Sequence, residues 1–144
     1  MIRIDVNELD KFCVQVVKMS AETENNVNKV IKNSAFNIQR NAMGNLASNG
    51  SVKTGHLRRG IAVNMGNLEA TVHTSNIKYA VMVEKGTKSH IIRPKNKKAL
   101  YWKGALRPVK QVKHPGSKAK PYLIPAFDKE KDKIIENLSK IIKW

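Results

Sequence analysis

Residues that build catalytic and metal centres are scarce in this sequence. It contains one cysteine, Cys13, which excludes an internal disulfide and fits a chain made in a reducing cytosol. Cys13 lies among apolar residues at helical spacing, so we expect a buried and unreactive thiol. The four histidines have no ligand spacing, and neither a GxSxG element nor a glycine-rich phosphate loop occurs. We therefore predict no catalytic residue, no metal and no cofactor.

Long apolar runs and aromatic residues are also scarce. No apolar stretch approaches the about 18 residues of a membrane-spanning helix, and aromatic residues make up 6% of the chain. The opening residues 1–6 lack the charged-then-apolar order of a signal peptide, and we expect no membrane contact. A length of 144 residues fits a single domain, 1–144, with a first part (1–50), a middle part (51–120) and a last part (121–144).

Acidic residues are the third scarcity: 11 Asp and Glu stand against 27 Lys and Arg, for a net charge of +16. Residues 85–120 contain twelve Lys or Arg and no acid, and we call this segment the basic ribbon. A block of one sign attracts polyanions at long range. Because 21 of the 27 basic residues are lysines, a lysine-rich source proteome is the alternative explanation for part of the excess. The candidates for facing a polyanion are Lys95, Lys97, Lys98, Lys103, Arg107, Lys110 and Lys113.

Two aromatic residues, Tyr101 and Trp102, are interleaved with the lysines of the basic ribbon. Such mixing can bind single-stranded nucleic acid, with rings stacked on bases and lysines along the phosphates. Alternatively, Leu100 and Trp102 pack inward while the lysines are solvated. We favour inward packing for the rings. We do not favour simple solvation for the charge, because twelve like charges without counterions repel one another.

The first 50 residues are predicted to be mostly helical. Alternation over residues 2–6 predicts a short strand, and Asn7 offers an N-cap for the helix that follows. Apolar residues at helical spacing then reach Leu46. These apolar residues become sparse at residues 20–26. The segment is therefore either one long helix or two helical pieces with a bend between them. The composition of residues 45–53 predicts a loop.

The rest of the chain is predicted to form hairpins and a terminal helix. Alternating apolar residues at 61–65 and 68–72 flank Gly66-Asn67 and predict a β-hairpin. Residues 79–83 form either a buried strand or a helical turn. Short apolar pieces in the basic ribbon indicate an extended hairpin with weak cover, and Pro125 fits the first turn of a terminal amphipathic helix. The predicted fold class is α+β: a small antiparallel β-sheet with a long N-terminal helix and a C-terminal helix packed against it, plus the basic hairpin.

Three blocks of sequence occur in a fixed order: TGHLRRGI (54–61), YAVMVEKGT (79–87) and KPYLIPAF (120–127). Together they resemble the small neck proteins of long-tailed phages, the head–tail joining or tail-completion family, whose pattern runs TGxLRxSI, YAxxVExGT and PFLxPAF. The resemblance covers roughly residues 52–130. The positions that match, with structural roles implied by the resemblance, are Thr54, Gly55, Leu57, Arg58, Tyr79, Glu84, Gly86, Thr87, Pro121, Leu123, Pro125, Ala126 and Phe127.

Each block marks a change in the direction of the chain. Gly55 and Gly60 bracket a turn into a strand, and Gly86 ends an alternating apolar run. Two positions depart from the family pattern: Lys85 stands where an aromatic residue is usual, and Tyr122 replaces the usual Phe.

The resemblance implies a fold, a role and a set of partners. The fold is a small antiparallel sheet flanked by two helices, with subunits arranged as a ring around the DNA path. The role is structural rather than enzymatic, in the neck or tail of the virion, with assembly in the host cytoplasm. The implied partners are further copies of the chain, neighbouring head-connector and tail proteins, and passing double-stranded DNA. Adaptor, joining protein and terminator stay open as positions in the neck.

The alternative interpretation is a small basic nucleic-acid enzyme such as a ribonuclease toxin. Its candidate catalytic groups are His90, Glu84 and Arg93. A plain nucleic-acid-binding module is a third interpretation. Glu84 lies directly before the basic ribbon, so it is either a general base or the partner of Lys85 in an ion pair that fixes the turn; we favour the ion pair.

Overall fold

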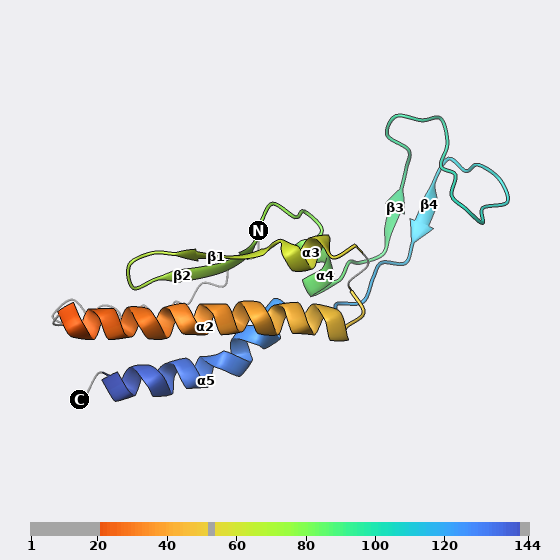
Figure 1. The fold of residues 1–144 in the computed structure, drawn as a ribbon. Coiled ribbons are helices and arrows are strands. Elements are labelled where there is room, and N and C mark those ends of the chain that lie inside the picture. The colour runs from red at the N-terminus through yellow and green to blue at the C-terminus, as the bar shows by residue number, and fades with distance from the viewer. Residues whose placement is uncertain (1–20, 52–53, 142–144) are drawn as a thin grey trace.

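Figure 1 shows the computed structural model, which describes residues 21–51 and 54–141. The elements are, in order, α2 (Ala21–Ser48), α3 (His56–Arg59), β1 (Ile61–Met65), β2 (Ala70–Thr74), α4 (Ala80–Lys85), β3 (His90–Ile92), β4 (Val112–His114) and α5 (Leu123–Ile141). They form an α+β fold, which confirms the predicted class. The strand expected at residues 2–6, the Asn7 cap and Cys13 lie outside the described residues.

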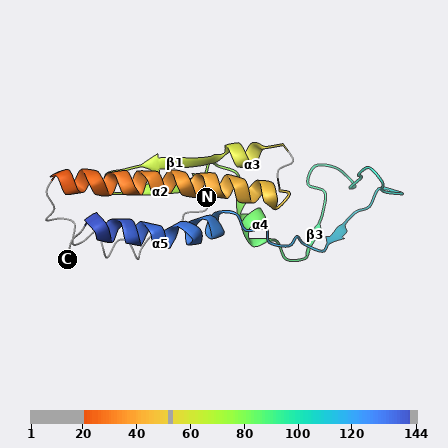
Figure 2. The same cartoon turned by 60° about the horizontal axis from the view of Figure 1, so that its bottom comes forward.

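Helix α2 is the middle layer of the folded body. Apolar residues recur along it every three or four positions, and those that are buried are Val27, Ala35, Ile38, Ala42 and Leu46. The β1–β2 hairpin covers one side of α2, and α5 packs along another side (Figures 1 and 2). The helix is continuous over 28 residues, about 42 Å at 1.5 Å per residue. It therefore continues through residues 21–26, where the apolar pattern thins.

The loop predicted from Asn45 onward begins only after Ser48. The Ser48 hydroxyl donates to the carbonyl oxygens of Gly44 and Asn45, each at 3.1 Å, within the last turn of the helix. Asn and Ser are weak helix formers, and this composition suggested an earlier end. Full burial of Leu46 in the core extends the helix past them.

Strands β1 and β2 form the predicted antiparallel hairpin, with the first residue of β1 opposite the last residue of β2. Polar side chains of α2 hold the hairpin in place. Gln39 Nε2 donates to the carbonyl oxygen of Ile61 at 2.7 Å, and Asn28 Oδ1 accepts from the N–H of Leu68 at 2.7 Å. Because these contacts lie near opposite ends of the hairpin, they align it along the helix.

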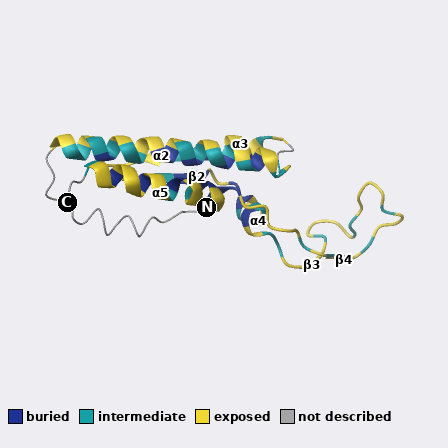
Figure 3. Cartoon of the chain, turned by 90° about the horizontal axis from the view of Figure 1, so that it is seen from below, coloured by how far each residue is buried: buried dark blue, intermediate teal, exposed yellow. Residues whose placement is uncertain are grey.

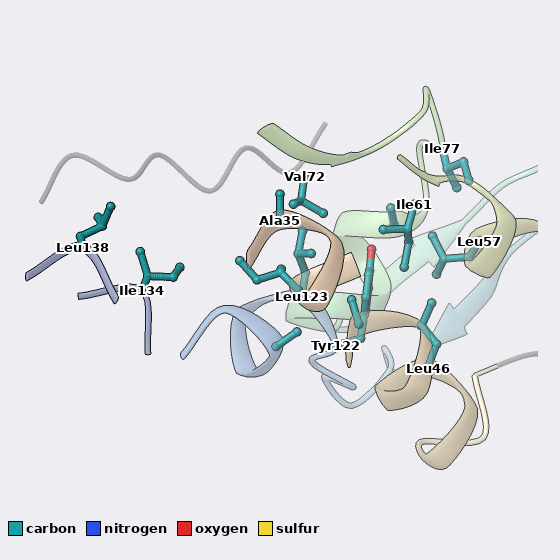
Figure 4. Packing of buried hydrophobic residues seen from close by; sticks show 14 of the residues in the cluster. Ala35, Leu46, Leu57, Ile61, Val72, Ile77, Tyr122, Leu123, Ile134 and Leu138 are labelled. Carbon is teal, nitrogen blue, oxygen red and sulfur yellow. The ribbon is translucent and has the colours of Figure 1, made fainter. Parts of the chain in front are cut away.

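The core lies where α2, the hairpin and the start of α5 meet. Its large and almost completely buried apolar side chains include Leu46, Ile61 and Leu123, together with the ring of Tyr122 (Figure 4). These four residues come from three different parts of the chain. Their burial therefore joins the three layers into one hydrophobic cluster.

The Tyr122 hydroxyl is the unusual feature of this core. Neither it nor the buried hydroxyl of Thr74 makes a hydrogen bond of good geometry to a described residue. Burial raises the pKa of Tyr122, the Glu84 carboxylate raises it further, and the nearby Thr74 hydroxyl opposes the rise. The phenol is therefore a neutral group that is largely cut off from water.

Tyr122→Phe is expected to raise the free energy of unfolding by about 1 kcal/mol, because it removes an unsatisfied buried hydroxyl and keeps the ring. Urea denaturation followed by circular dichroism measures the change. Leu123→Ala, at the adjacent buried position, is the control and should lower the same quantity by about 2–5 kcal/mol. A loss of more than about 1 kcal/mol for Tyr122→Phe would show that the hydroxyl is well bonded after all.

Helix α5 packs along α2 through one side. Its buried apolar residues are Leu123, Ala126, Ile134 and Leu138. Phe127 is half-buried at the edge of this contact, and Pro125 lies in the first turn, as predicted. The buried carboxylate of Glu130 accepts a hydrogen bond from Asn37 Nδ2 at 2.8 Å. This polar contact fixes the alignment of the two helices.

Residues 79–83 lead into and form helix α4, not a strand, and the basic ribbon leaves the body after it. Within the ribbon, β3 and β4 pair antiparallel, and a bridge between Leu100 and Val109 continues the pairing toward the tip. The ribbon extends past the end of the body, and most of its residues are exposed (Figures 1 and 3). The predicted extended hairpin with weak cover is therefore confirmed.

Candidate functional site

The second and third sequence blocks meet at the carboxylate of Glu84, near the end of α4. Its Oε2 accepts hydrogen bonds from the N–H groups of Tyr122 (2.8 Å) and Leu123 (3.0 Å), and its Oε1 accepts from Ile124 (3.0 Å). These N–H groups lie at the start of α5, where no partner exists within the helix. The next residue, Pro125, has no N–H to satisfy. Glu84 therefore caps α5 from a distant part of the chain.

The prediction that Glu84 forms an ion pair with Lys85 is wrong. Glu84 is 2% exposed, whereas Lys85 is exposed to solvent. The buried amide donors and the positive end of the α5 dipole compensate for the burial of the carboxylate. One sequence signal pointed to this role: residues 120–122 offer no Ser, Thr, Asp or Asn to cap the helix, so the cap had to come from elsewhere.

Gly86 sets the path of the chain as it leaves α4. Its φ of 72° and ψ of −176° are a conformation that is essentially restricted to glycine. An added Cβ would lie 2.6 Å from the carbonyl oxygen of Ser117 and 2.7 Å from the N–H nitrogen of Ala119. Directly after this turn, Thr87 and Ser117 exchange two backbone hydrogen bonds of 2.9 and 3.1 Å. The two strands of the basic ribbon are therefore clamped together where they leave the body.

The first block forms the short helix α3, not the simple turn that we predicted between Gly55 and Gly60. Gly55 has a φ of 72° directly before the helix, and Gly60 follows its end. Leu57 is buried in the core, while Thr54 and Arg58 are exposed. Burial of Leu57 is the tertiary contact that turns the bracketed segment into a helical turn.

The thirteen positions that match the family pattern therefore separate into three sets by burial. Those that are buried are Leu57, Glu84, Leu123 and Ala126. Partial burial is found for Gly55, Gly86, Thr87 and Phe127. Those that are exposed are Thr54, Arg58, Tyr79, Pro121 and Pro125. Packing explains the first two sets, whereas the exposed side chains call for a contact outside the core.

A groove of about 580 Å³ lies between the three blocks, at the point where the basic ribbon returns to the body. Its apolar lining residues are Leu46, Leu57, Tyr79 and Val83. Its basic lining residues are His56, Arg58, Lys118 and Lys120. No acidic residue is among the described residues that line it. Sequence reasoning missed this groove, because its walls come from parts of the chain that are far apart in sequence.

All candidate polyanion-facing residues are exposed, and the structure gathers them on the basic ribbon. They are Lys95, Lys97, Lys98, Lys103, Arg107, Lys110 and Lys113. None of them forms an ion pair with another residue in the described part of the chain. The ribbon therefore presents concentrated positive charge on an element that projects from the body (Figure 3).

The predicted inward packing of the aromatic residues is wrong. Tyr101 is 69% exposed and Trp102 is 50% exposed, and Leu106 beyond them is also fully exposed. The physical reason is that the ribbon is a two-stranded layer with no helix or second sheet over it, so it has no interior. Leu100 and Val109, which pair with each other, are half-buried.

The residues of the enzymatic interpretation do not come together in one site. The Glu84 carboxylate is buried and bonded to three backbone N–H groups, so it is not free to accept a proton from a substrate. His90 lies on β3, where its ring is 5.1 Å from the ring of His114. Arg93 is exposed beyond β3. The arrangement offers no shared acid–base centre for these three residues.

Among residues 21–51 and 54–141, no group of three or more His, Cys, Asp or Glu side chains is placed to hold a metal ion. None of the described helices is both long and apolar enough to cross a membrane.

Comparison with known protein families matches residues 10–86, 77 of the 144 residues, to the HK97-gp10-like family, described as "Bacteriophage HK97-gp10, putative tail-component". The matched region includes the first sequence block, the second block up to Gly86, α2 and the β1–β2 hairpin. No curated protein and no solved structure gave a significant match. The resemblance read from the sequence is thus confirmed at the level of the family, and the chain belongs to the HK97-gp10-like family of structural bacteriophage tail components.

Proposed function

We propose that the chain is a neck subunit: a head–tail joining or tail-completion protein that assembles into a ring around the path of the viral DNA. Family membership supports a structural role in the tail. The third sequence block, at 120–127, lies beyond the matched residues and carries the further resemblance to neck proteins. The proposed location is the neck of the virion, after assembly in the host cytoplasm.

The observation that carries this proposal is the basic ribbon. It holds twelve cations and no acid, and it projects past the body of its own subunit (Figure 1). Like charges repel unless an anion is near, so this element is suited to a strongly anionic partner. Duplex DNA carries one negative charge for about every 1.7 Å of its length. In a ring, the ribbons of successive subunits would face the passing DNA together.

The proposed protein partners are further copies of the chain and the neighbouring head-connector and tail proteins. Aromatic residues that are exposed on a free subunit often become buried at the centre of a protein interface, where aromatic residues are enriched. Tyr101 and Trp102 near the tip of the ribbon are residues of this kind. The cations of the ribbon would therefore bind the DNA phosphates, while the aromatic rings at its tip would contact an adjacent protein.

Replacing five ribbon lysines by Gln should weaken the binding of duplex DNA. The variant changes Lys95, Lys97, Lys98, Lys110 and Lys113. For the unchanged chain, the logarithm of affinity should fall linearly with the logarithm of salt concentration, by about 0.9 for each phosphate contacted. The variant should flatten this slope by up to about 4.5 and leave Tm nearly unchanged, because solvated lysines contribute little to folding. Fluorescence anisotropy with a labelled duplex at several salt concentrations measures the slope.

A second variant with the same loss of charge is the control for this experiment. It carries Gln at five exposed lysines of the body: Lys29, Lys32, Lys78, Lys129 and Lys133. This variant should keep a slope close to that of the unchanged chain. Equal slopes for both variants, or no DNA binding at low salt, would remove the proposed role of the ribbon and favour the lysine-rich source proteome as the explanation of the charge.

A further inference from the structure

Three of the five exposed residues of the family pattern gather around the groove between the three blocks. Thr54, Arg58 and Tyr79 are all exposed, and all three line the groove. Thr54 Oγ1 accepts a hydrogen bond from the His56 N–H at 3.4 Å, and the Tyr79 hydroxyl lies 3.4 Å from His56 Nδ1, but neither core packing nor the capping of α5 uses these side chains. The groove is therefore the feature of the molecule that the fold and the basic ribbon leave unexplained.

The chemistry of the groove fits a carboxylate beside an apolar side chain. Lys120 Nζ already donates to the carbonyl oxygen of Asn49 at 3.0 Å, whereas Arg58 and Lys118 make no ion pair with a described residue. The Ser51 hydroxyl also lines the groove, is buried, and has no hydrogen-bond partner among the residues described. Two free cations and an unsatisfied hydroxyl thus stand beside the apolar lining of the groove.

An exposed face of α5 has the complementary chemistry. Ile124, Asp128, Asp132 and Ile135 are spaced by four, four and three residues, so they lie on one side of the helix, and all four are exposed. Glu136, farther along, is paired with Lys140 at 2.7 Å. No described residue of the same copy pairs with Asp128 or Asp132. The face therefore carries free carboxylates between two exposed isoleucines.

We propose that the groove of one copy binds the outer face of α5 of a second copy. Asp128 and Asp132 would meet Arg58 and Lys118, and Ile135 would enter the apolar part of the groove. The two surfaces consist of different residues, so the contact is heterologous and repeats from subunit to subunit, as a ring requires. This inference rests on the proposed ring and names the subunit contact that builds it.

A charge exchange between the two surfaces tests the contact. One full-length variant carries Arg58→Glu and Lys118→Glu, and another carries Asp128→Lys and Asp132→Lys. All four side chains are exposed, so both variants should keep the Tm of the unchanged chain. In sedimentation velocity at low salt, the unchanged chain should form closed oligomers. Each variant alone should weaken self-association by at least about 30-fold, because like charges then face each other.

The mixture of the two variants gives the decisive result. Each groove of one variant then matches the α5 face of the other, so an equimolar mixture should recover oligomers of alternating subunits. Lys29→Glu with Lys32→Glu on α2 is a control that makes the same charge change as the groove variant, and it should oligomerise normally. Oligomers from either variant alone, or a mixture that stays monomeric, would overturn the proposed contact while the ring stands. An unchanged chain that stays monomeric at all concentrations would overturn the ring as well.

Discussion

Glu84→Ala should lower the free energy of unfolding by about 3–5 kcal/mol, a large share of the total for a domain of this size. The substitution leaves the buried N–H groups of Tyr122 and Leu123, and the partly buried N–H of Ile124, without their acceptor. It also removes a negative charge from the N-terminus of α5. Because the same carboxylate joins α4 to α5, the loss should loosen the terminal helix. Urea denaturation followed by circular dichroism measures the effect.

Two further variants separate capping from general effects of charge. Glu69→Ala removes an exposed carboxylate in the β1–β2 turn and should change stability by no more than about 0.5 kcal/mol. Glu84→Gln keeps one acceptor oxygen but places an N–H₂ group against N–H donors. Its free energy of unfolding should therefore lie between that of Glu84→Ala and that of the unchanged chain. If Glu84→Ala were as stable as Glu69→Ala, the capping role of Glu84 would be refuted.

Gly86→Ala should lower the free energy of unfolding by at least about 3 kcal/mol. The backbone conformation of Gly86, with a φ of 72° and a ψ of −176°, is strained by about 1–3 kcal/mol for any other residue. The added Cβ would in addition collide with backbone atoms of Ser117 and Ala119 at 2.6 and 2.7 Å. Either the turn after α4 or the return strand of the ribbon must then move. Thermal denaturation and amide exchange across residues 87 and 117 measure the two consequences.

Gly44→Ala is the matched control for this change. Gly44 lies in the interior of α2, and a Cβ built there meets no other atom within 4 Å. Alanine should therefore stabilise the chain by about 0.5–1 kcal/mol through its higher helix propensity. A loss of stability at both glycines would mean that the effect at Gly86 does not arise from its special geometry.

Local patterns in the sequence were enough to predict most of the elements. The three- and four-residue spacing of Ala35, Ile38, Ala42 and Leu46 specifies the helix that the structure shows. Strict alternation on both sides of Gly66-Asn67 specifies the first hairpin. The element at residues 79–83 stayed open, because a short apolar run has no period of its own. Only tertiary contacts decide such a segment, and here burial of Ala80 and Glu84 selects a helix.

The contacts that join the elements could not be predicted from these local patterns. Glu84 caps a helix that begins about forty residues later, so nothing near it in the sequence indicates the role. Trp102 was predicted to pack inward with Leu100, but the ribbon has no second layer against which it could pack. The groove shows the same limit, since Leu46, Arg58 and Lys118 meet only after folding. The exposed cations of the ribbon, in contrast, follow from a local run of charge that sequence alone displays.

The most direct test of the neck assignment is to locate the chain in assembled particles. A gold-labelled antibody against the chain, applied to intact virions and imaged by electron microscopy, reports its position. The proposed function predicts label at the junction of head and tail, on nearly every complete particle, and no label along the tail shaft. Label spread along the shaft, or absent from complete particles, would contradict the assignment.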